Sequence, residues 1–166
     1  MGSQLVNFTC ALGITAALSG CALTSSSTNA SSDEVKKLVI LHTNDNHGRF
    51  WHNEKGEYGM AARKTLIDRL RREAKASNQE VVLLSGGDIN TGVPESDMQF
   101  AEPDFKGMSK IGYDAMALGN HEFDNPLSVL EKQQAWSNFP LLSANIIDKA
   151  TNKHAYQPYT VIDKGG

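Results

Sequence analysis

Three short polar clusters hold the side chains of this 166-residue chain whose types and spacing suit chemistry on a metal ion. Asp45 and His47 are separated by one residue, so both can turn toward one ion from an extended loop. Asp88 has two carboxylate oxygens, enough to bridge two cations, and Asn120 offers a neutral carbonyl oxygen. Oxygen and imidazole ligands without a thiolate favour Mn, Mg, Zn, Co or Fe. The clusters therefore predict a site for divalent metal ions.

The elements that must position these clusters are short strands, because each cluster follows an apolar run typical of a buried strand. The predicted strands cover residues 38–42, 81–84, 115–118 and 140–144. Helical patterns separate them at residues 60–76, 104–111 and 127–136. This alternation predicts an α/β fold with helices packed on a largely parallel sheet. Parallel strands bring their carboxyl ends to one edge, so the three clusters are expected to converge there.

The helix predicted at residues 60–76 is amphipathic. Its expected buried face consists of Leu66, Ile67, Leu70 and Ala74. Its arginines, including Arg63 and Arg71, are expected to lie elsewhere on the helix. At the last helix, Asn125 is the predicted N-cap and Pro126 the first helical residue.

The N-terminal region indicates export. No Asp, Glu, Lys or Arg precedes Asp33, and residues 8–18 form an apolar stretch that is too short for a permanent membrane span but fits a secretory signal. It ends in Leu18-Ser-Gly-Cys21, which resembles the bacterial lipobox, where the Cys becomes the lipidated first residue. The segment before it carries no Lys or Arg, which departs from that pattern. An ordinary cleaved signal, leaving a soluble periplasmic protein, is the alternative.

These observations divide the chain into three parts. Residues 1–20 are the predicted signal peptide, residues 21–36 the lipidated Cys21 with a Ser/Thr-rich flexible tether, and residues 37–166 the folded part. The two cysteines, Cys10 and Cys21, both precede the folded part, which therefore has no thiol for a disulfide or for zinc. The net charge of −3 gives no basic field for a nucleic-acid polymer, and no protein partner is evident.

The clusters together resemble a known family. Asp45-x-His47, Gly87-Asp88 and the run 119–122 (Gly-Asn-His-Glu) are similar to the motifs of the calcineurin-like dinuclear metallophosphoesterases. Longer strings at residues 41–45, 86–96 and 119–126 resemble the bacterial periplasmic 5′-nucleotidase/UDP-sugar hydrolase branch. The likeness extends from about residue 38 to about residue 147. It implies the N-terminal part of a four-layer α/β/β/α metallophosphoesterase domain.

The resemblance implies a metal role for each cluster. Asp45 and His47 would bind the first of two divalent ions, with Mn, Mg, Zn or Co as candidates. Asp88 would bridge both ions, and Asn120 would bind the second. Such a pair of ions catalyses phosphoester hydrolysis, by activating water and by clamping the phosphoryl oxygens.

The resemblance also implies a catalytic dyad of His121 and Asp124, acting on 5′-nucleotides, with nucleotide sugars as a second candidate substrate. The family completes its site with later histidines, whereas this chain has only His154 after Asp124, in a segment expected to be a surface turn. The family's C-terminal nucleotide-binding domain has no counterpart either, so the sequence is interpreted as the front part of a longer protein. Two alternatives stay open: a 2′,3′-cyclic nucleotide phosphodiesterase with the same metal site, and a lipid-anchored fragment that binds metal weakly without turnover.

Replacing Cys21 by serine tests the anchor. Ala22 after this Cys resembles the outer-membrane sorting pattern, and bacterial lipoproteins of this type carry the several acyl chains that stable attachment needs. In a Gram-negative host, Cys21→Ser should release the protein from the outer membrane or leave it unprocessed, as measured by fractionation and by the mass of the mature chain. Cys10→Ser, within the predicted signal, should change neither. Unchanged retention and processing of the Cys21→Ser variant would contradict lipidation.

Overall fold

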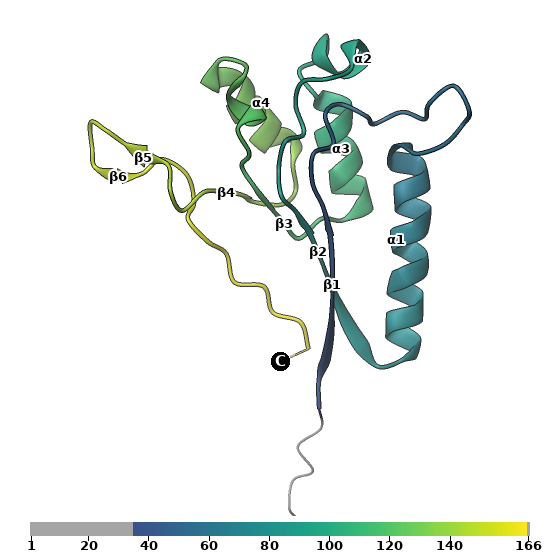
Figure 1. Ribbon diagram of the computed structural model, residues 1–166. Coiled ribbons are helices and arrows are strands. Elements are labelled where there is room, and N and C mark those ends of the chain that lie inside the picture. Colours follow the sequence, from purple (N-terminus) through teal and green to yellow (C-terminus); the bar gives the residue numbers. More distant parts are fainter. Residues whose placement is uncertain (1–34, 166) are drawn as a thin grey trace, which may run out of the picture. The chain divides into compact units, whose positions relative to one another are not determined.

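The computed structural model describes residues 35–165. The predicted signal peptide, Cys21 and nearly all of the tether lie outside that range, so their roles stay predictions. Four parallel strands form one sheet in the order β1-β2-β3-β4 (Figure 1). The strands are β1 (Lys37–Thr43), β2 (Gln79–Ser85), β3 (Ala115–Ala117) and β4 (Leu141–Leu142). The first three match their predicted positions closely, whereas the fourth is shorter than predicted.

Helices connect these strands, which confirms the predicted α/β fold class. They are α1 (Gly59–Ala76), α2 (Pro94–Asp97), α3 (Glu102–Ile111), the 3₁₀ helix η1 (His121–Phe123) and α4 (Leu127–Trp136). After β4, the short strands β5 (Ile147–Asp148) and β6 (Lys153–His154) form a separate hairpin. His154 is exposed there, as expected. None of the helices between residues 35 and 165 has the length and apolar character needed to cross a bilayer.

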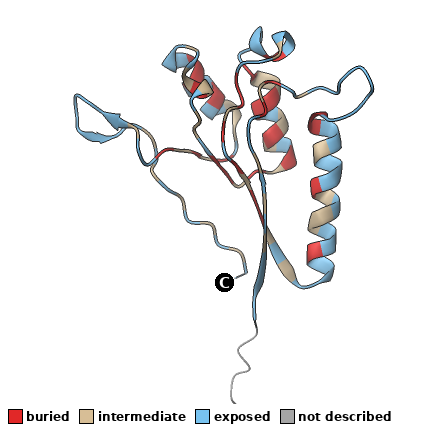
Figure 2. Ribbon diagram, in the orientation of Figure 1, coloured by how far each residue is buried: buried red, intermediate tan, exposed pale blue. Residues whose placement is uncertain are grey.

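One apolar cluster joins the helices to the sheet, and buried residues gather between them (Figure 2). Phe105 and Met108 from α3 and Leu83 from β2 are fully buried, and α1 and α4 contribute Ile67 and Leu130. Burial of apolar surface stabilises a fold by about 25 cal/mol per Å². Because this cluster packs the helices against the strands, the ends of each loop that follows a strand are held in place by the core.

The buried face of α1 differs from the predicted one. Ile67 and Ala74 are buried as expected, but Leu66 is 45% exposed. Arg63 and Arg71, expected elsewhere on the helix, are partly buried and donate to polar groups outside α1. The Arg71 guanidinium donates at 2.5 Å to the carbonyl of Ile111, the last residue of α3, and to that of Gly112, which caps the helix. Long arginine stems can pack along apolar surface while the charged ends find acceptors, which hydropathy patterns do not register.

The start of α4 also differs from the prediction by one residue. Pro126, not Asn125, occupies the N-cap position, with no side-chain hydrogen bond to the helix. Pro126 has an extended backbone, with φ of −53° and ψ of 146°, so the helix begins only at Leu127. The Pro126 carbonyl still accepts the Val129 N–H at 2.8 Å, which closes the first turn.

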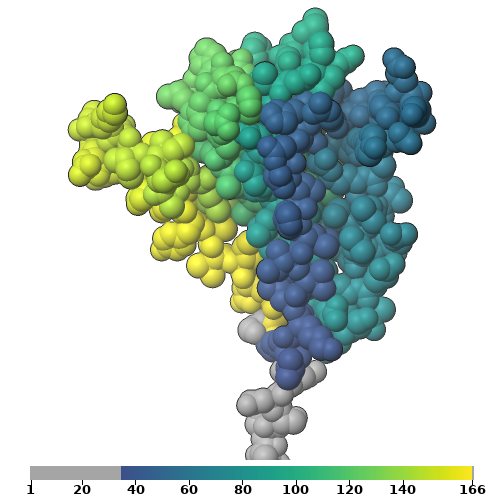
Figure 3. Space-filling view, viewed as in Figure 1, coloured from purple at the N-terminus to yellow at the C-terminus, as the bar shows by residue number. Residues whose placement is uncertain are grey.

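The face of β1 that points away from the helices is exposed. Side chains alternate along a strand, so Leu38 and Ile40 share this face, and they are 53% and 61% exposed. β1 is an edge strand of the sheet formed by the described residues. In the space-filling view it runs uncovered along the front of the molecule (Figure 3). An edge strand with exposed apolar side chains favours pairing with other chains.

Ile40→Glu is therefore expected to reduce concentration-dependent association, measured by light scattering. Its effect on the free energy of unfolding should be within about 1 kcal/mol, because the side chain is already exposed. The matched control is Leu41→Glu, the next residue of β1, which points toward the core and should lower that free energy by about 2 kcal/mol or more. Equal association of the Ile40→Glu variant and the parent chain would rule out β1 as the associating surface.

Candidate metal centre

The loops after β1, β2 and β3 converge at one edge of the sheet, as the parallel order predicted. One nitrogen each from His47 and His121 and one carboxylate oxygen from Asp88 lie within 4.8 Å of one another. The two imidazole rings meet edge to face, with centroids 4.8 Å apart. Ligand atoms lie about 2 Å from a bound transition-metal ion, so donors this close need only small movements to share one.

The other two predicted ligands lie on the same loops but are more open. The Asp45 carboxylate lies 3.9 Å from His47 Nε2, with its side chain 55% exposed. Asn120 is exposed and directly precedes η1. The structure thus places His121 beside His47 and Asp88, in addition to its predicted catalytic role, while the ligand roles of Asp45, His47, Asp88 and Asn120 stay predictions.

Backbone hydrogen bonds continue from the paired strands into the loops. The Asp45 N–H donates to the Gly87 carbonyl at 3.0 Å, the His47 N–H to the Asp88 carbonyl at 3.0 Å, and the Gly48 N–H to the Ile89 carbonyl at 2.8 Å. Because each bond joins the first loop to the second, the two loops stay tied together beyond the ends of β1 and β2.

Three of the predicted ligands have a left-handed backbone. The φ angles are 54° for Asp45, 48° for His47 and 54° for Asp88. For residues other than glycine this conformation costs about 1–3 kcal/mol, and it persists where the surroundings impose it. Such strain is concentrated at functional sites, which is consistent with the chemistry expected here.

Close backbone packing joins the second and third loops. A Cβ atom on Gly119 would lie 2.2 Å from Asp88 Oδ1, and one on Gly87 would lie 2.5 Å from the Gly119 nitrogen. The His121 N–H donates to the same Asp88 oxygen at 3.0 Å. Only glycine fits at both positions, and the Asp88 carboxylate is pressed against the loop that carries His121.

Glu122 is a site residue to which the sequence assigned no role. Its side chain is buried, and its carboxylate accepts the N–H groups of Asp88 at 3.0 Å, Ile89 at 2.8 Å and Gly119 at 2.7 Å. A carboxylate that accepts several backbone donors forms strong, charge-assisted hydrogen bonds. Glu122 thereby ties the loop of Asp88 to the loop of His121. The signal available in the sequence was its place inside the third cluster.

His121 and Asp124 form the pair that the resemblance implied. His121 Nδ1 lies 2.7 Å from Asp124 Oδ2. This hydrogen bond raises the pKa of His121, and the negative charges of Asp124, Asp88 and Glu122 raise it further. The pKa of Asp124 is lowered, first by a hydrogen bond from the Thr91 hydroxyl and then by the one from His121. The geometry favours a protonated imidazole beside an ionised carboxylate.

The orientation of His47 is fixed by the second loop. Its Nδ1 lies 2.8 Å from the Thr91 carbonyl oxygen, which can only accept, so Nδ1 is the protonated nitrogen. Nε2 is then left to bind a metal, an arrangement typical of histidine ligands. The Gly92 backbone packs directly on His47, because a Cβ atom on Gly92 would lie 2.8 Å from the His47 carbonyl oxygen.

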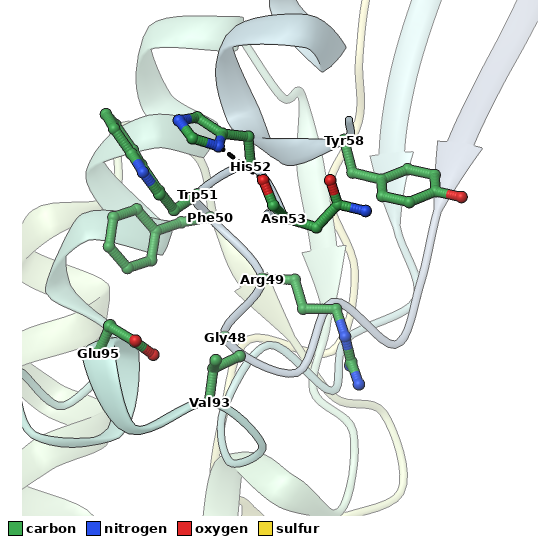
Figure 4. Close-up of a pocket in the computed structure, with 9 residues that line it drawn as sticks. All are labelled: Gly48, Arg49, Phe50, Trp51, His52, Asn53, Tyr58, Val93 and Glu95. Carbon is green, nitrogen blue, oxygen red and sulfur yellow. Dashed lines mark hydrogen bonds between the residues drawn. The ribbon is translucent and has the colours of Figure 1, made fainter. Parts of the chain in front are cut away.

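A pocket of about 560 Å³ lies next to His47, along the loop between β1 and α1 (Figure 4). It is lined by Gly48, Arg49, Phe50, Trp51, His52, Asn53, Tyr58, Val93 and Glu95. The lining is mainly apolar and includes three aromatic side chains. None of the clustered donor residues lines it, so the pocket is a neighbour of the donor cluster and not part of it.

The donor atoms fit a divalent cation. Imidazole nitrogen and carboxylate oxygen meet at one place, and the folded part of the chain contains no cysteine. This ligand set suits Mn, Zn, Co, Fe or Mg. The sequence pattern of the calcineurin-like phosphoesterases matches residues 38–166. This chain belongs to that family.

Known members of the family include close relatives. A 5′-nucleotidase from Vibrio cholerae serotype O1 is 69% identical over 153 residues, which cover 92% of this chain and 28% of that protein. Protein UshA from Escherichia coli K12 is 61% identical over 80% of this chain and 24% of its own length. The crystal structure of a 5′-nucleotidase precursor from Thermus thermophilus superposes with a TM-score of 0.64 at 32% identity, covering 76% of this chain and 26% of that one. The chain thus spans about a quarter of the length of these relatives.

The pairing of His121 with Asp124 can be measured in the metal-free chain. We expect the His121 imidazole to stay protonated to higher pH in the parent than in Asp124→Asn, because a neutral amide does not stabilise the imidazolium charge. Nuclear magnetic resonance titration of the ring gives both midpoints. Asp68→Asn, which removes a carboxylate paired with Lys64 on α1, is the control and should leave the midpoint unchanged. Identical midpoints in the parent and in Asp124→Asn would contradict the pairing.

Proposed function

We propose that this chain carries the first half of the active site of an exported, metal-dependent phosphoesterase that hydrolyses 5′-nucleotides. The observation that carries the proposal is the convergence of His47, Asp88 and His121 from loops far apart in the sequence. The names of the relatives from Vibrio cholerae and Thermus thermophilus support the substrate class. Nucleotide sugars are a second substrate class to be tested, in keeping with the sequence resemblance.

The proposed metal ligands are those of the sequence analysis. Asp45 and His47 would hold one divalent ion, Asp88 would bridge to a second, and Asn120 would complete the protein ligands that this chain supplies. When bound, such ions supply positive charge for the phosphoryl oxygens and lower the pKa of a bound water. The tautomer of His47 and the close packing of Asp88 on the third loop support these roles.

His121 and Asp124 would move the proton. A protonated His121 presents an N–H to the phosphoryl group or to the leaving oxygen, where negative charge develops. Asp124 keeps that proton in place through the hydrogen bond between Nδ1 and Oδ2. Because the pKa of His121 is raised, the protonated donor persists to higher pH than a free histidine would allow. Once His121 has donated its proton to the leaving oxygen, the imidazole is neutral. It would then take a new proton from solvent, and the Asp124 carboxylate would favour that reprotonation.

The exported location is a separate part of the proposal. The uncharged N-terminus and the lipobox-like Leu18-Ser-Gly-Cys21 support export and attachment to the outer membrane by lipid on Cys21. A soluble periplasmic form is the alternative. An extracytoplasmic position would give the enzyme access to nucleotides that do not cross membranes unaided.

Joining this chain to the remainder of the Vibrio cholerae 5′-nucleotidase, in place of the 153 matching residues, gives a direct test. The chimaera should hydrolyse AMP with Mn²⁺ and lose activity with a chelator. Chain 1–166 alone should bind Mn²⁺ weakly and show no useful turnover, because its four ligands leave two ions under-coordinated. Preference for a 2′,3′-cyclic nucleotide or a nucleotide sugar over AMP would reassign the substrate. Full turnover by chain 1–166 alone would overturn the ligand assignment.

Within the chimaera, Asp88→Asn should lower AMP hydrolysis by about 100-fold or more, because it removes an anionic oxygen shared by two ions. Asn90→Ala is the matched control on the same loop. Asn90 is buried and pairs with Gln133 through amide hydrogen bonds of 2.7 and 3.3 Å, so its loss should mainly lower stability. Equal and small effects of the two substitutions on the rate would show that Asp88 only shapes the loop.

A further inference from the structure

A buried polar network lies beneath the turn formed by Asp45 and His47, and the proposed reaction does not use it. Asp104, in the first turn of α3, is 0% exposed. The Asn46 amide nitrogen donates to Asp104 Oδ1 at 2.6 Å, and the Ser96 hydroxyl donates to Asp104 Oδ2 at 2.6 Å. The two oxygens of one carboxylate thus hold two different segments of the chain.

Asn46 is held from both ends of its amide group. Besides donating to Asp104, it accepts the Arg63 guanidinium on Oδ1 at 2.7 Å. Asn46 is 5% exposed, whereas its neighbours on either side point toward the donor cluster. Both neighbours have the left-handed backbone described above. These hydrogen bonds fix the Asn46 side chain, and the backbone on either side of Asn46 leads directly to Asp45 and His47.

The burial of the Asp104 carboxylate lowers the stability of the folded chain. Burial raises the pKa of Asp104 to about 6, against the opposing hydrogen bond from Ser96 and the charge of Arg63. At neutral pH the carboxylate stays mostly ionised, but because folding raises this pKa, it is less stable in the folded chain than in water, which lowers the free energy of unfolding. The hydrogen bonds from Ser96 and Asn46 and the charge of Arg63 offset part of this cost, so the buried carboxylate depends on these partners.

We propose that Asp104 is a positioning residue for the metal centre: through Asn46, it sets the orientation of the turn that presents Asp45 and His47. The inference rests on the proposed function, in which these two residues are metal ligands. Asp104 acts on them through the central asparagine of the turn, to which Arg63 lends a second hydrogen bond. Asn46, which lies between the two proposed ligands, would thereby transmit the effect of Asp104 to them.

Amide hydrogen exchange of the full, metal-free chain tests the positioning directly. In Asp104→Ala, the amides of residues 45–48 should exchange at least about tenfold faster, while those of α1 change little. Asp104→Asn should restore slow exchange, because its amide oxygen still accepts from Asn46 and its nitrogen can donate to Ser96. The matched control is Ser96→Ala, which removes the other hydrogen bond of the same carboxylate. It should speed exchange in α2 and not in residues 45–48.

Mn²⁺ affinity provides the second readout, measured by electron paramagnetic resonance on the same variants. Asp104→Ala should weaken Mn²⁺ binding by about 10–100-fold, with recovery in Asp104→Asn and no comparable loss in Ser96→Ala. Should Asp104→Ala fail to fold, Asn46→Ala removes the same hydrogen bond from the other side and should give the same faster exchange. Unchanged exchange at residues 45–48, or an equal change in Ser96→Ala, overturns the proposal. Failure of the parent chain to bind Mn²⁺ would instead count against the proposed function, since exchange needs no metal.

Discussion

The hydrogen bonds that carry the pairing of β1 and β2 past the ends of these strands are the constraint on which the candidate site depends. The N–H groups of Asp45, His47 and Gly48 meet successive carbonyls of the loop after β2. In an ordinary α/β protein, loops at this edge are free to diverge once the strands end. Here these hydrogen bonds hold the first two loops against each other, with the predicted ligands Asp45, His47 and Asp88 in the left-handed conformation.

Two buried acids then attach the rest of the site to this frame by different means. Glu122 binds backbone N–H groups of the second and third loops, so it fixes the path of the chain whatever side chains are present. Asp104 binds the side chains of Asn46 and Ser96, so its effect depends on those particular residues. The acid that binds backbone groups holds the loops as a whole, whereas the acid that binds side chains is proposed to orient the turn of the predicted ligands Asp45 and His47.

The negative charges at this edge of the sheet favour both the proposed metal binding and the proposed proton transfer. Asp88, Glu122 and Asp124 surround His121 and favour its charged form. The same negative charges, with Asp45 beside His47, attract divalent cations. One arrangement of acids therefore suits both parts of the chemistry. The exposure of Asp45 and Asn120 shows that the described residues leave one side of the candidate site open.

The sequence by itself determined the order of the elements and the edge at which the chemistry gathers. Hydropathy periodicity is a local property, and parallel order makes the convergence of Asp88 with the other clusters a consequence of topology. Only the tertiary structure decided which charged and polar side chains are buried. Leu66 is exposed, whereas Arg63 is partly buried because its guanidinium finds an acceptor, Asn46 Oδ1, outside its own helix. Glu122 and Asp104 gain their roles from partners about 30 to 60 residues away. A buried charge is stable only where distant groups supply its hydrogen bonds, and folding alone brings those groups together.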